Sequence, residues 1–282
     1  MTAPYEQPQA PIWQGGQPLG SYISPIPVRR ATLGDALASE WTKIRSVRST
    51  MWTLGVMIVL MVGVGSLTAW GISLADATPD TESVLPLGFF GVLLGSICVI
   101  TLGVLTIASE YGTGMIRTTL TACPSRGRVL AAKSIVFFLL VFTITTLTAG
   151  LVGGVQVALL DGRAPTGEEW VRATFGVGFY MALLGLLALA VGALIRHSAG
   201  AITIMIGAVL LPLVLAMFMF SPSLADVQEA LFAYSIPSQL AVLYDTSMTG
   251  SGPRGWDPLL IGTGVTAVVM VSAFFALNRR DV

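Results

Sequence analysis

The stretch ATFGVGFYMALLGLLALAVGALIRHSAGAITIMIGAVLLPLVLAMFMF, residues 173–220, decides the fold class of this chain. It holds two apolar segments, 173–195 and 199–220, which are separated only by residues 196–198. Each segment is long enough to cross the hydrocarbon core of a bilayer as a helix, which takes about 20 residues. Because three residues leave room only for a tight turn, we expect a hairpin of two membrane-spanning helices.

Four more segments of similar length and polarity occupy the rest of the chain. Together with the hairpin they give six predicted spans, at 51–70, 87–108, 129–160, 173–195, 199–220 and 259–277. The composition agrees, because 54% of the 282 residues are hydrophobic and 11% are charged, against about 25% charged in soluble domains. We therefore predict an all-α, polytopic membrane protein whose six-span domain covers 32–282. Residues 1–31, rich in Pro and Gln, are predicted to form a disordered cytoplasmic tail.

The basic residues indicate the orientation of these spans. All 15 except Arg163, Arg172 and Arg254 fall in the N-terminal region, in the second-to-third and fourth-to-fifth connectors, or at the C-terminus. Lys133 is counted here with the second-to-third connector. Since cytoplasmic loops carry the excess of Lys and Arg, both termini are predicted to be cytoplasmic. We expect the protein in the cell (plasma or inner) membrane as a multi-pass protein. The net charge is +0, so no nucleic-acid partner is expected.

Residues 32–49 have the pattern of an amphipathic helix that precedes the first span. Thr32 and Asp35 form a weak capping box at its start, while Lys43 lies on its polar side and Arg45 near the membrane entry. Such a helix can lie in the membrane interface, although a soluble extension of the first span also fits. Its apolar positions are Leu33, Leu37, Trp41, Ile44 and Met51.

The connector ASEYGTGMIRTTLTACPSRGRVLAAK, residues 108–133, is longer than a simple turn needs. Glu110 closes the second span, Gly112 and Gly114 allow a sharp change of direction, and Thr113 can cap a short amphipathic helix that follows. Two interpretations fit these residues. The helix is either a knob that fits a cytosolic partner or a solvated basic turn that only fixes topology.

Recognisable catalytic motifs are missing from the sequence, which has no GxxxxGK[ST], HExxH or GxSxG. A single histidine and two cysteines offer no metal set. We therefore expect no catalytic, cofactor-binding or metal-binding residue in this chain. Gln156 is the most polar side chain deep within a predicted span, and the lack of deep charges argues against a gradient-driven transporter.

Two segments resemble the permease subunits of ABC-2 type exporters, especially small bacterial permeases whose ATPase is a separate chain. They are LASEWTKIRSVRSTMWTL, residues 37–54, and the 108–133 connector, in which SEY, GT and IR are the most specific letters. The resemblance covers about 32–282. It implies a transport subunit rather than an enzyme, with a path for an amphipathic, drug-like or lipid-like substrate.

The resemblance also implies partners and residue roles. Two copies of an ABC ATPase, which would hold ATP and Mg, are expected to bind a pair of permeases made with a second copy or a sister chain, within membrane lipid. A cytoplasmic coupling helix at 110–120 would contact the ATPase, and the helix at 32–49 would be an interfacial connecting helix. A gradient-driven transporter or channel without an ATPase, and a non-transporting scaffold, remain as alternatives. The implied ATPase contacts are Glu110, Tyr111, Gly112, Thr113, Gly114, Met115, Ile116 and Arg117, and the connecting-helix residues are Leu37, Trp41, Lys43, Ile44 and Arg45.

Overall fold

The computed structural model describes residues 32–75, 83–123, 125–246 and 250–279. The predicted tail, 1–31, lies outside the described residues. Within the described ranges all regular elements are helices, apart from one isolated bridge between Ser83 and Arg163. The prediction of an all-α chain is confirmed for this part.

Six helices are long and apolar enough to cross a membrane, as predicted. Each overlaps one predicted segment, and most extend beyond it. The fourth, for example, begins at Gly167, where Thr166 and Glu169 form a capping box, rather than at 173. The six are α2 (Arg48–Leu74), α3 (Phe89–Gly112, after a short turn at Leu85–Gly88), α5 (Arg126–Leu159), α6 and α7 (Gly167–Val171 and Val177–Ile195, joined through a π-helical turn at Arg172–Gly176), α8 (Ser198–Met217) and α11 (Asp257–Arg279).

Four shorter α-helices and one 3-10 turn (Pro222–Leu224) complete the described elements. The helices are α1 (Leu33–Ser46), α4 (Met115–Ala122), α9 (Ala225–Ala233) and α10 (Ile236–Leu243). The predicted capping box of α1 is present, with Thr32 and Asp35 each accepting a hydrogen bond from the other's backbone N–H. The predicted helix at 32–49 is not continuous. Val47 is extended, with φ −84° and ψ 110°, so α1 ends there and Ser49 belongs to α2.

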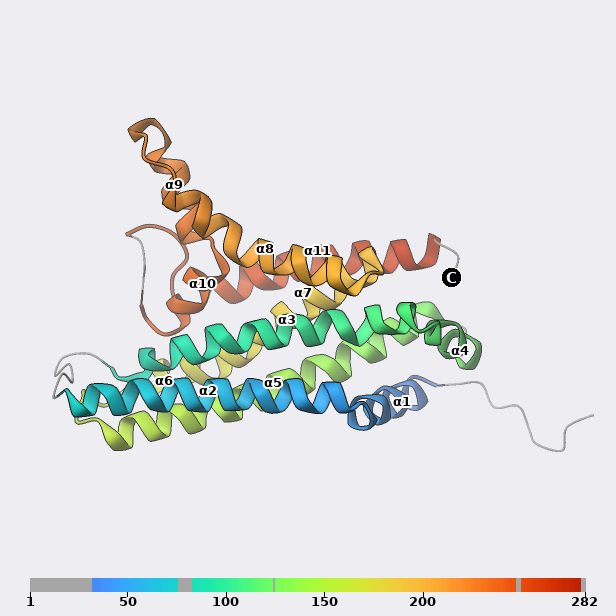
Figure 1. Cartoon of the computed structure of the whole chain (residues 1–282), viewed down its shortest axis with the longest axis horizontal. Helices are drawn as coiled ribbons and strands as arrows, with labels where there is room; N and C mark the ends of the chain where they lie inside the picture. The colour runs from blue at the N-terminus through green and yellow to red at the C-terminus, as the bar shows by residue number, and fades with distance from the viewer. Residues whose placement is uncertain (1–31, 76–82, 124, 247–249, 280–282) are drawn as a thin grey trace, which may run out of the picture. The chain divides into compact units, whose positions relative to one another are not determined.

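Helices α3 and α7 form the centre of the bundle. They pack along each other, with α2 and α5 on one side and α8 and α11 on the other (Figure 1). The contact is close because glycines meet: a Cβ on Gly103 of α3 would lie 2.3 Å from the carbonyl oxygen of Gly185 on α7. Small residues allow such approach where no hydrophobic effect drives helices together. The outer helices α2, α8 and α11 instead leave much of their apolar surface exposed.

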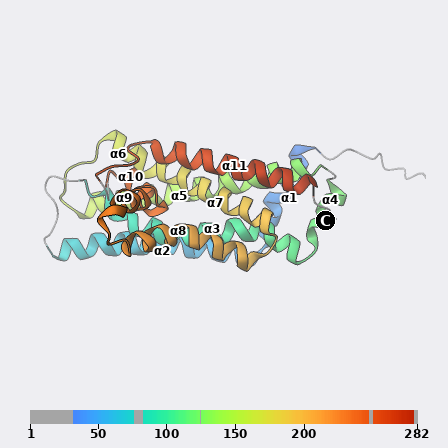
Figure 2. The ribbon, with the colours of Figure 1, turned by 90° about the horizontal axis from the view of Figure 1, so that it is seen from above.

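The short helices gather at the two ends of the bundle. Helices α1 and α4 lie at the end of the bundle where α11 also ends, while α6, α9 and α10 lie at the other (Figures 1 and 2). We call the first the elbow end, after the turn at 113–114 between α3 and α4.

Candidate functional site

The elbow itself is a sharp turn between two helices. Helix α3 continues through Gly112, Thr113 follows, and Gly114 adopts the left-handed conformation with φ 72° before α4 begins at Met115. Because an L side chain is strained at that φ, a glycine is needed there. Ser125 then caps α5, its hydroxyl accepting from the N–H of Arg128.

Two expectations for the elbow are wrong. The helix predicted at 110–120 is two elements: Glu110, Tyr111 and Gly112 belong to α3, and only Met115, Ile116 and Arg117 of the predicted contacts lie on α4. Thr113 does not cap α4. Its hydroxyl donates to the carbonyl of Ser109, and the N-cap position is occupied by Gly114. Gly114 occupies the N-cap position because the turn requires a positive φ there.

The eight predicted contact residues therefore do not share one surface. Ile116 is buried against the bundle, and Glu110 points inward. Met115, Arg117 and Thr118 are exposed on α4, as are Gly112, Thr113 and Gly114 in the turn. The residues that can touch another protein without rearrangement are thus those of the turn and the outer face of α4.

Four charged side chains meet behind the elbow, and we call them the elbow cluster: Glu40 and Lys43 of α1, Glu110 of α3 and Lys133 of α5. The Nζ atom of Lys133 lies 2.6 Å from Oε2 of Glu40 and 2.9 Å from Oε1 of Glu110. The Nζ atom of Lys43 lies 2.7 Å from Oε1 of Glu40 and 2.9 Å from the same Glu110 oxygen. Each amine therefore bridges both carboxylates.

The cluster is buried and ties four elements together. Side-chain exposure is 2% for Lys133, 5% for Glu40 and 6% for Glu110. Lys43 also donates to the hydroxyl of Thr119 on α4, at 3.2 Å. Burying an unpaired charge costs several kcal/mol, whereas two carboxylates and two amines in mutual contact offset that cost. The arrangement holds α1, α3, α4 and α5 in one fixed register.

Lys43 is the member of the cluster closest to solvent. Burial alone would lower its pKa, but the hydrogen bonds that it donates to Glu40 and Glu110, and their negative charges, leave the pKa raised. Lys43 is therefore fully charged at neutral pH.

Tyr111, which follows Glu110, contacts the turn between α7 and α8. The guanidinium of Arg196 lies over the ring of Tyr111, 4.9 Å from its centroid, a cation–π contact. Arg196 ends α7 with a left-handed φ of 58°. The end of α3 therefore contacts α1 and α5 through Glu110 and the α7–α8 turn through Tyr111.

A further contact holds the start of α5. Nη1 of Arg126 donates to the carbonyl of Leu277 in the last turn of α11, at 2.7 Å. A Cβ on Gly127 would lie 2.7 Å from Cε2 of Phe274. Both flanks of the elbow are thus fastened to the bundle.

The five predicted connecting-helix residues divide between inside and outside. Ile44 is buried and Leu37 half-buried, and Lys43 joins the elbow cluster. Trp41 and Arg45 are exposed. One face of α1 packs on α5 and α2, and its exposed tryptophan suits a membrane interface.

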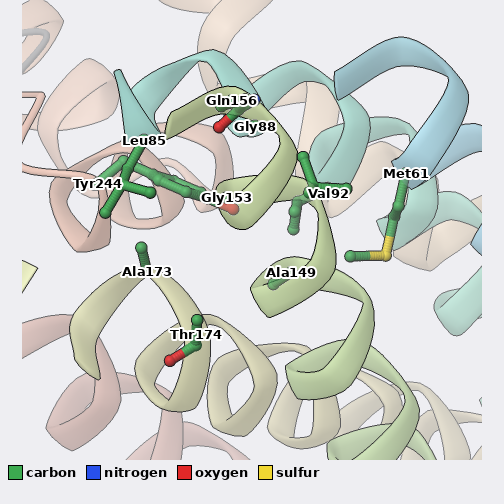
Figure 3. Close-up of a pocket in the computed structure, with 11 residues that line it drawn as sticks. Met61, Leu85, Gly88, Val92, Ala149, Gly153, Gln156, Ala173, Thr174 and Tyr244 are labelled. Carbon is green, nitrogen blue, oxygen red and sulfur yellow. The ribbon is translucent and has the colours of Figure 1, made fainter. Parts of the chain in front are cut away.

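A second polar position lies toward the other end of the bundle. Gln156, fully buried on α5, donates from Nε2 to the carbonyl of Gly65 at 3.2 Å, and its Oε1 atom has no hydrogen-bond partner. Figure 3 shows it beside Gly88 at the edge of a cavity of about 10 Å³, with Tyr244 and Thr174 on other walls. That volume holds about one water molecule, which is too little for a transported substrate.

Two members of the elbow cluster were missed by sequence reasoning. The sequence assigns no role to Glu40, and Lys133 is counted only among the basic residues of the second-to-third connector. A signal was available, because Lys133 lies seven residues inside α5, among the apolar residues of VLAAKSIVFF. A lysine in such surroundings needs a carboxylate partner.

The described residues contain no group of three or more His, Cys, Asp or Glu that could hold a metal ion. No model of a known protein family matches the sequence, and a search of curated proteins finds no match either.

Proposed function

We propose that this chain is the permease subunit of an ATP-driven exporter of the ABC-2 type. A separate ATPase, present in two copies, holds ATP and Mg and performs hydrolysis. This chain pairs with a second copy or a sister permease in the plasma (inner) membrane and forms the path for an amphipathic, drug-like or lipid-like substrate. The elbow end and both termini face the cytoplasm, and α1 lies in the membrane interface.

The observation that carries the proposal is the elbow cluster. A turn that only fixed topology would gain nothing from buried ties to three other helices. With Glu110, Lys133, Lys43 and Thr119 in one network, a push on α4 is passed to α1, α3 and α5 together. Coupling of two sites needs such a contiguous physical connection or a shared two-state element.

The outer face of the elbow supplies the contact surface in this proposal. Met115 is 46% exposed, and Arg117 and Thr118 on the same helix are also exposed. Ile116 is buried and holds α4 against the bundle. An apolar residue flanked by a cation and a hydroxyl on a short, firmly seated helix fits a groove on a soluble partner better than it fits solvent.

The distribution of charge favours ATP as the energy source over an ion gradient. On the six long helices, within the ranges that the structure describes, each Asp, Glu, Lys, Arg and His lies within about two helical turns of a helix end. Gradient-driven transporters commonly place such groups near the midplane. Transport that continued after ATP was drained, with ion gradients intact, would favour the gradient-driven alternative.

The proposal is tested by purification from native membranes. The protein, tagged at its C-terminus, is extracted in mild detergent with and without a non-hydrolysable ATP analogue, beside an unrelated multi-pass protein with the same tag. We expect a stoichiometric soluble chain that carries GxxxxGK[ST], present only with this protein. Preparations that repeatedly lack such a chain, with the analogue included, would contradict the proposal and leave the scaffold and gradient-driven alternatives.

A further inference from the structure

A symmetric pattern of tryptophan and arginine surrounds the break between α1 and α2, at the elbow end of the bundle (Figure 1). The sequence there reads WTKIRSVRSTMW, and on each helix one tryptophan and one arginine are four positions apart, which places them on one face. Both arginines are exposed, and the two tryptophans are 45% and 75% exposed. We call these four side chains the Trp–Arg surface: Trp41 and Arg45 of α1, Arg48 and Trp52 of α2.

The two arginines of this surface have no counter-charge. In the part of the chain that the structure describes, neither Arg45 nor Arg48 forms an ion pair or a side-chain hydrogen bond. Glu40, the acidic residue closest to them in sequence, is held by Lys43 and Lys133 in the elbow cluster. Three residues of chain span at most about 11 Å, so two like charges lie close together and repel each other unless an anion lies beside them.

The exposed face of α2 continues from the Trp–Arg surface along the span. The indole that follows the arginine lies one turn, about 6 Å, further along the helix, and indoles are enriched at the level between headgroups and hydrocarbon. The next exposed side chains on this face are aliphatic. The order of cation, indole and aliphatic groups is the order of phosphate, glycerol ester and acyl chain in a phospholipid. The residues of this face, at helical spacing, are Arg48, Trp52, Val56 and Val59.

We propose that the Trp–Arg surface binds the headgroup of an anionic phospholipid in the cytoplasmic leaflet. A guanidinium group can bind two phosphate oxygens with parallel hydrogen bonds, and a headgroup of net negative charge also balances the second arginine. A zwitterionic headgroup carries an ammonium group of its own, which the arginines repel. The inference takes from the proposed function only that α1 lies in the membrane interface, and it does not need the ATPase partner.

A simpler interpretation is that these arginines only set the orientation of α2, as basic residues next to spans commonly do. Arg117 on α4 separates the two interpretations. It is exposed at the same end of the bundle, but threonines occupy the positions four residues before and after it. An effect of charge alone would make Arg117 contribute to lipid binding as much as Arg45 or Arg48, whereas the proposed surface gives it no part.

The test compares two lipids that differ in net charge. Binding of phosphatidylglycerol and phosphatidylcholine with identical acyl chains to the purified, delipidated full-length protein is measured by native mass spectrometry, without any partner chain. Each arginine near an anionic headgroup is worth about fivefold in affinity, so we expect a preference of about tenfold or more for phosphatidylglycerol. Equal binding of the two lipids would overturn the inference even if a soluble ATPase is recovered with the chain. Selective binding supports it whether or not that ATPase exists.

Variants locate the preference on the Trp–Arg surface. In Arg45→Gln/Arg48→Gln we expect the preference to fall below about threefold, with an unchanged melting temperature because both side chains are exposed and unpaired. Trp52→Ala should weaken binding of both lipids and keep their ratio, since an indole carries no charge. Arg117→Gln is the matched control and should keep the wild-type preference. An unchanged preference in the double variant, or an equal loss in the control, would overturn the assignment.

Competition shows whether the ligand is a lipid or a soluble phosphate. Glycerol 1-phosphate carries the same phosphate group without acyl chains. Because acyl chains supply much of the affinity of a lipid for a membrane protein surface, it should not displace phosphatidylglycerol at about ten times the lipid concentration. Displacement at that concentration would identify a site for soluble phosphates and contradict the proposed lipid surface.

Discussion

Lys133 and Glu40, 93 positions apart in the chain, form a buried ion pair with 2.6 Å between Nζ and Oε2. The pair joins the long helix α5 to the amphipathic helix α1, and Glu110 and Lys43 complete it from α3 and α1. Both side chains are almost fully buried, so this pair, together with Glu110 and Lys43, fixes where α1 lies against the bundle.

The first prediction concerns the contribution of this ion pair to the free energy of unfolding. Lys133→Met leaves two buried carboxylates with one fewer amine, and we expect a loss of about 3–5 kcal/mol in the free energy of unfolding. In the double variant Glu40→Gln/Lys133→Met, one of these two carboxylates is also removed, so Lys43 and Glu110 remain as a matched pair. We expect the double variant to be more stable than the sum of the single changes implies, by about 0.5–3 kcal/mol. Thermal unfolding in detergent, followed by size-exclusion chromatography, gives the comparison, and strict additivity would argue against a coupled cluster.

The outer face of α4 makes a second prediction about partner binding. Met115→Asp and Arg117→Glu change exposed side chains, so stability should change by no more than about 0.5 kcal/mol. Under the proposed function, recovery of the soluble ATPase with the tagged chain should fall at least about tenfold, because a charge is placed or reversed in the contact. The readout is the ratio of the two chains after purification.

A charge-matched control for this experiment lies at the other end of the bundle. Arg254 is also exposed, close to the start of α11. Arg254→Glu should leave recovery of the partner unchanged. Normal recovery with both α4 variants would show that α4 is not the contact.

The close approach of α3 and α7 makes a third prediction. A Cβ at Gly103 would lie 2.3 Å from the backbone oxygen of Gly185, which cannot move without separating the helices. We expect Gly103→Ala to lower the free energy of unfolding by more than about 2 kcal/mol. Gly207→Ala is the control on α8, since a Cβ there meets nothing within 4 Å, and its helix propensity should make it neutral or stabilising by up to about 1 kcal/mol. Equal melting temperatures of the two variants would contradict the packing described here.

Lys43 makes a fourth prediction, on pH dependence. Its pKa is raised in the folded protein, so the stability that it contributes is fully present below the unfolded pKa, about 10.4. That contribution is lost as the pH rises through the folded value. The difference in melting temperature between wild type and Lys43→Met should therefore be constant from about pH 6 to pH 9 and shrink above about pH 10. A difference that already falls between about pH 6 and pH 8 would mean that another group controls the cluster.

Much of the fold was predictable because a membrane-spanning helix depends on residues that are close together in the sequence. Runs of apolar residues such as 173–195 and 199–220 must form helices to satisfy their backbone in lipid, and all six overlap long helices in the structure. A cap was predictable where a side chain reaches its own helix, as at Thr32. Thr113 failed as a cap because Gly114 decides the turn through its backbone conformation.

The candidate site was predictable only in outline. The glycines and the short helix at the elbow follow from spacing, but the sequence does not reveal that Glu110 turns inward while Met115 and Arg117 remain outside. Nor does it say that Thr119 of α4 accepts a hydrogen bond from Lys43. Such contacts depend on which helices become neighbours, and no local pattern records that.

By itself, the sequence determined the helical class, the six long apolar helices and the turn at Gly114, since each depends on residues close together in the chain. The tertiary structure alone decided that Glu40, Lys43, Glu110 and Lys133 meet. The physical reason is that a charge or hydroxyl can be buried only when its hydrogen bonds are met, and those partners come from helices distant in sequence.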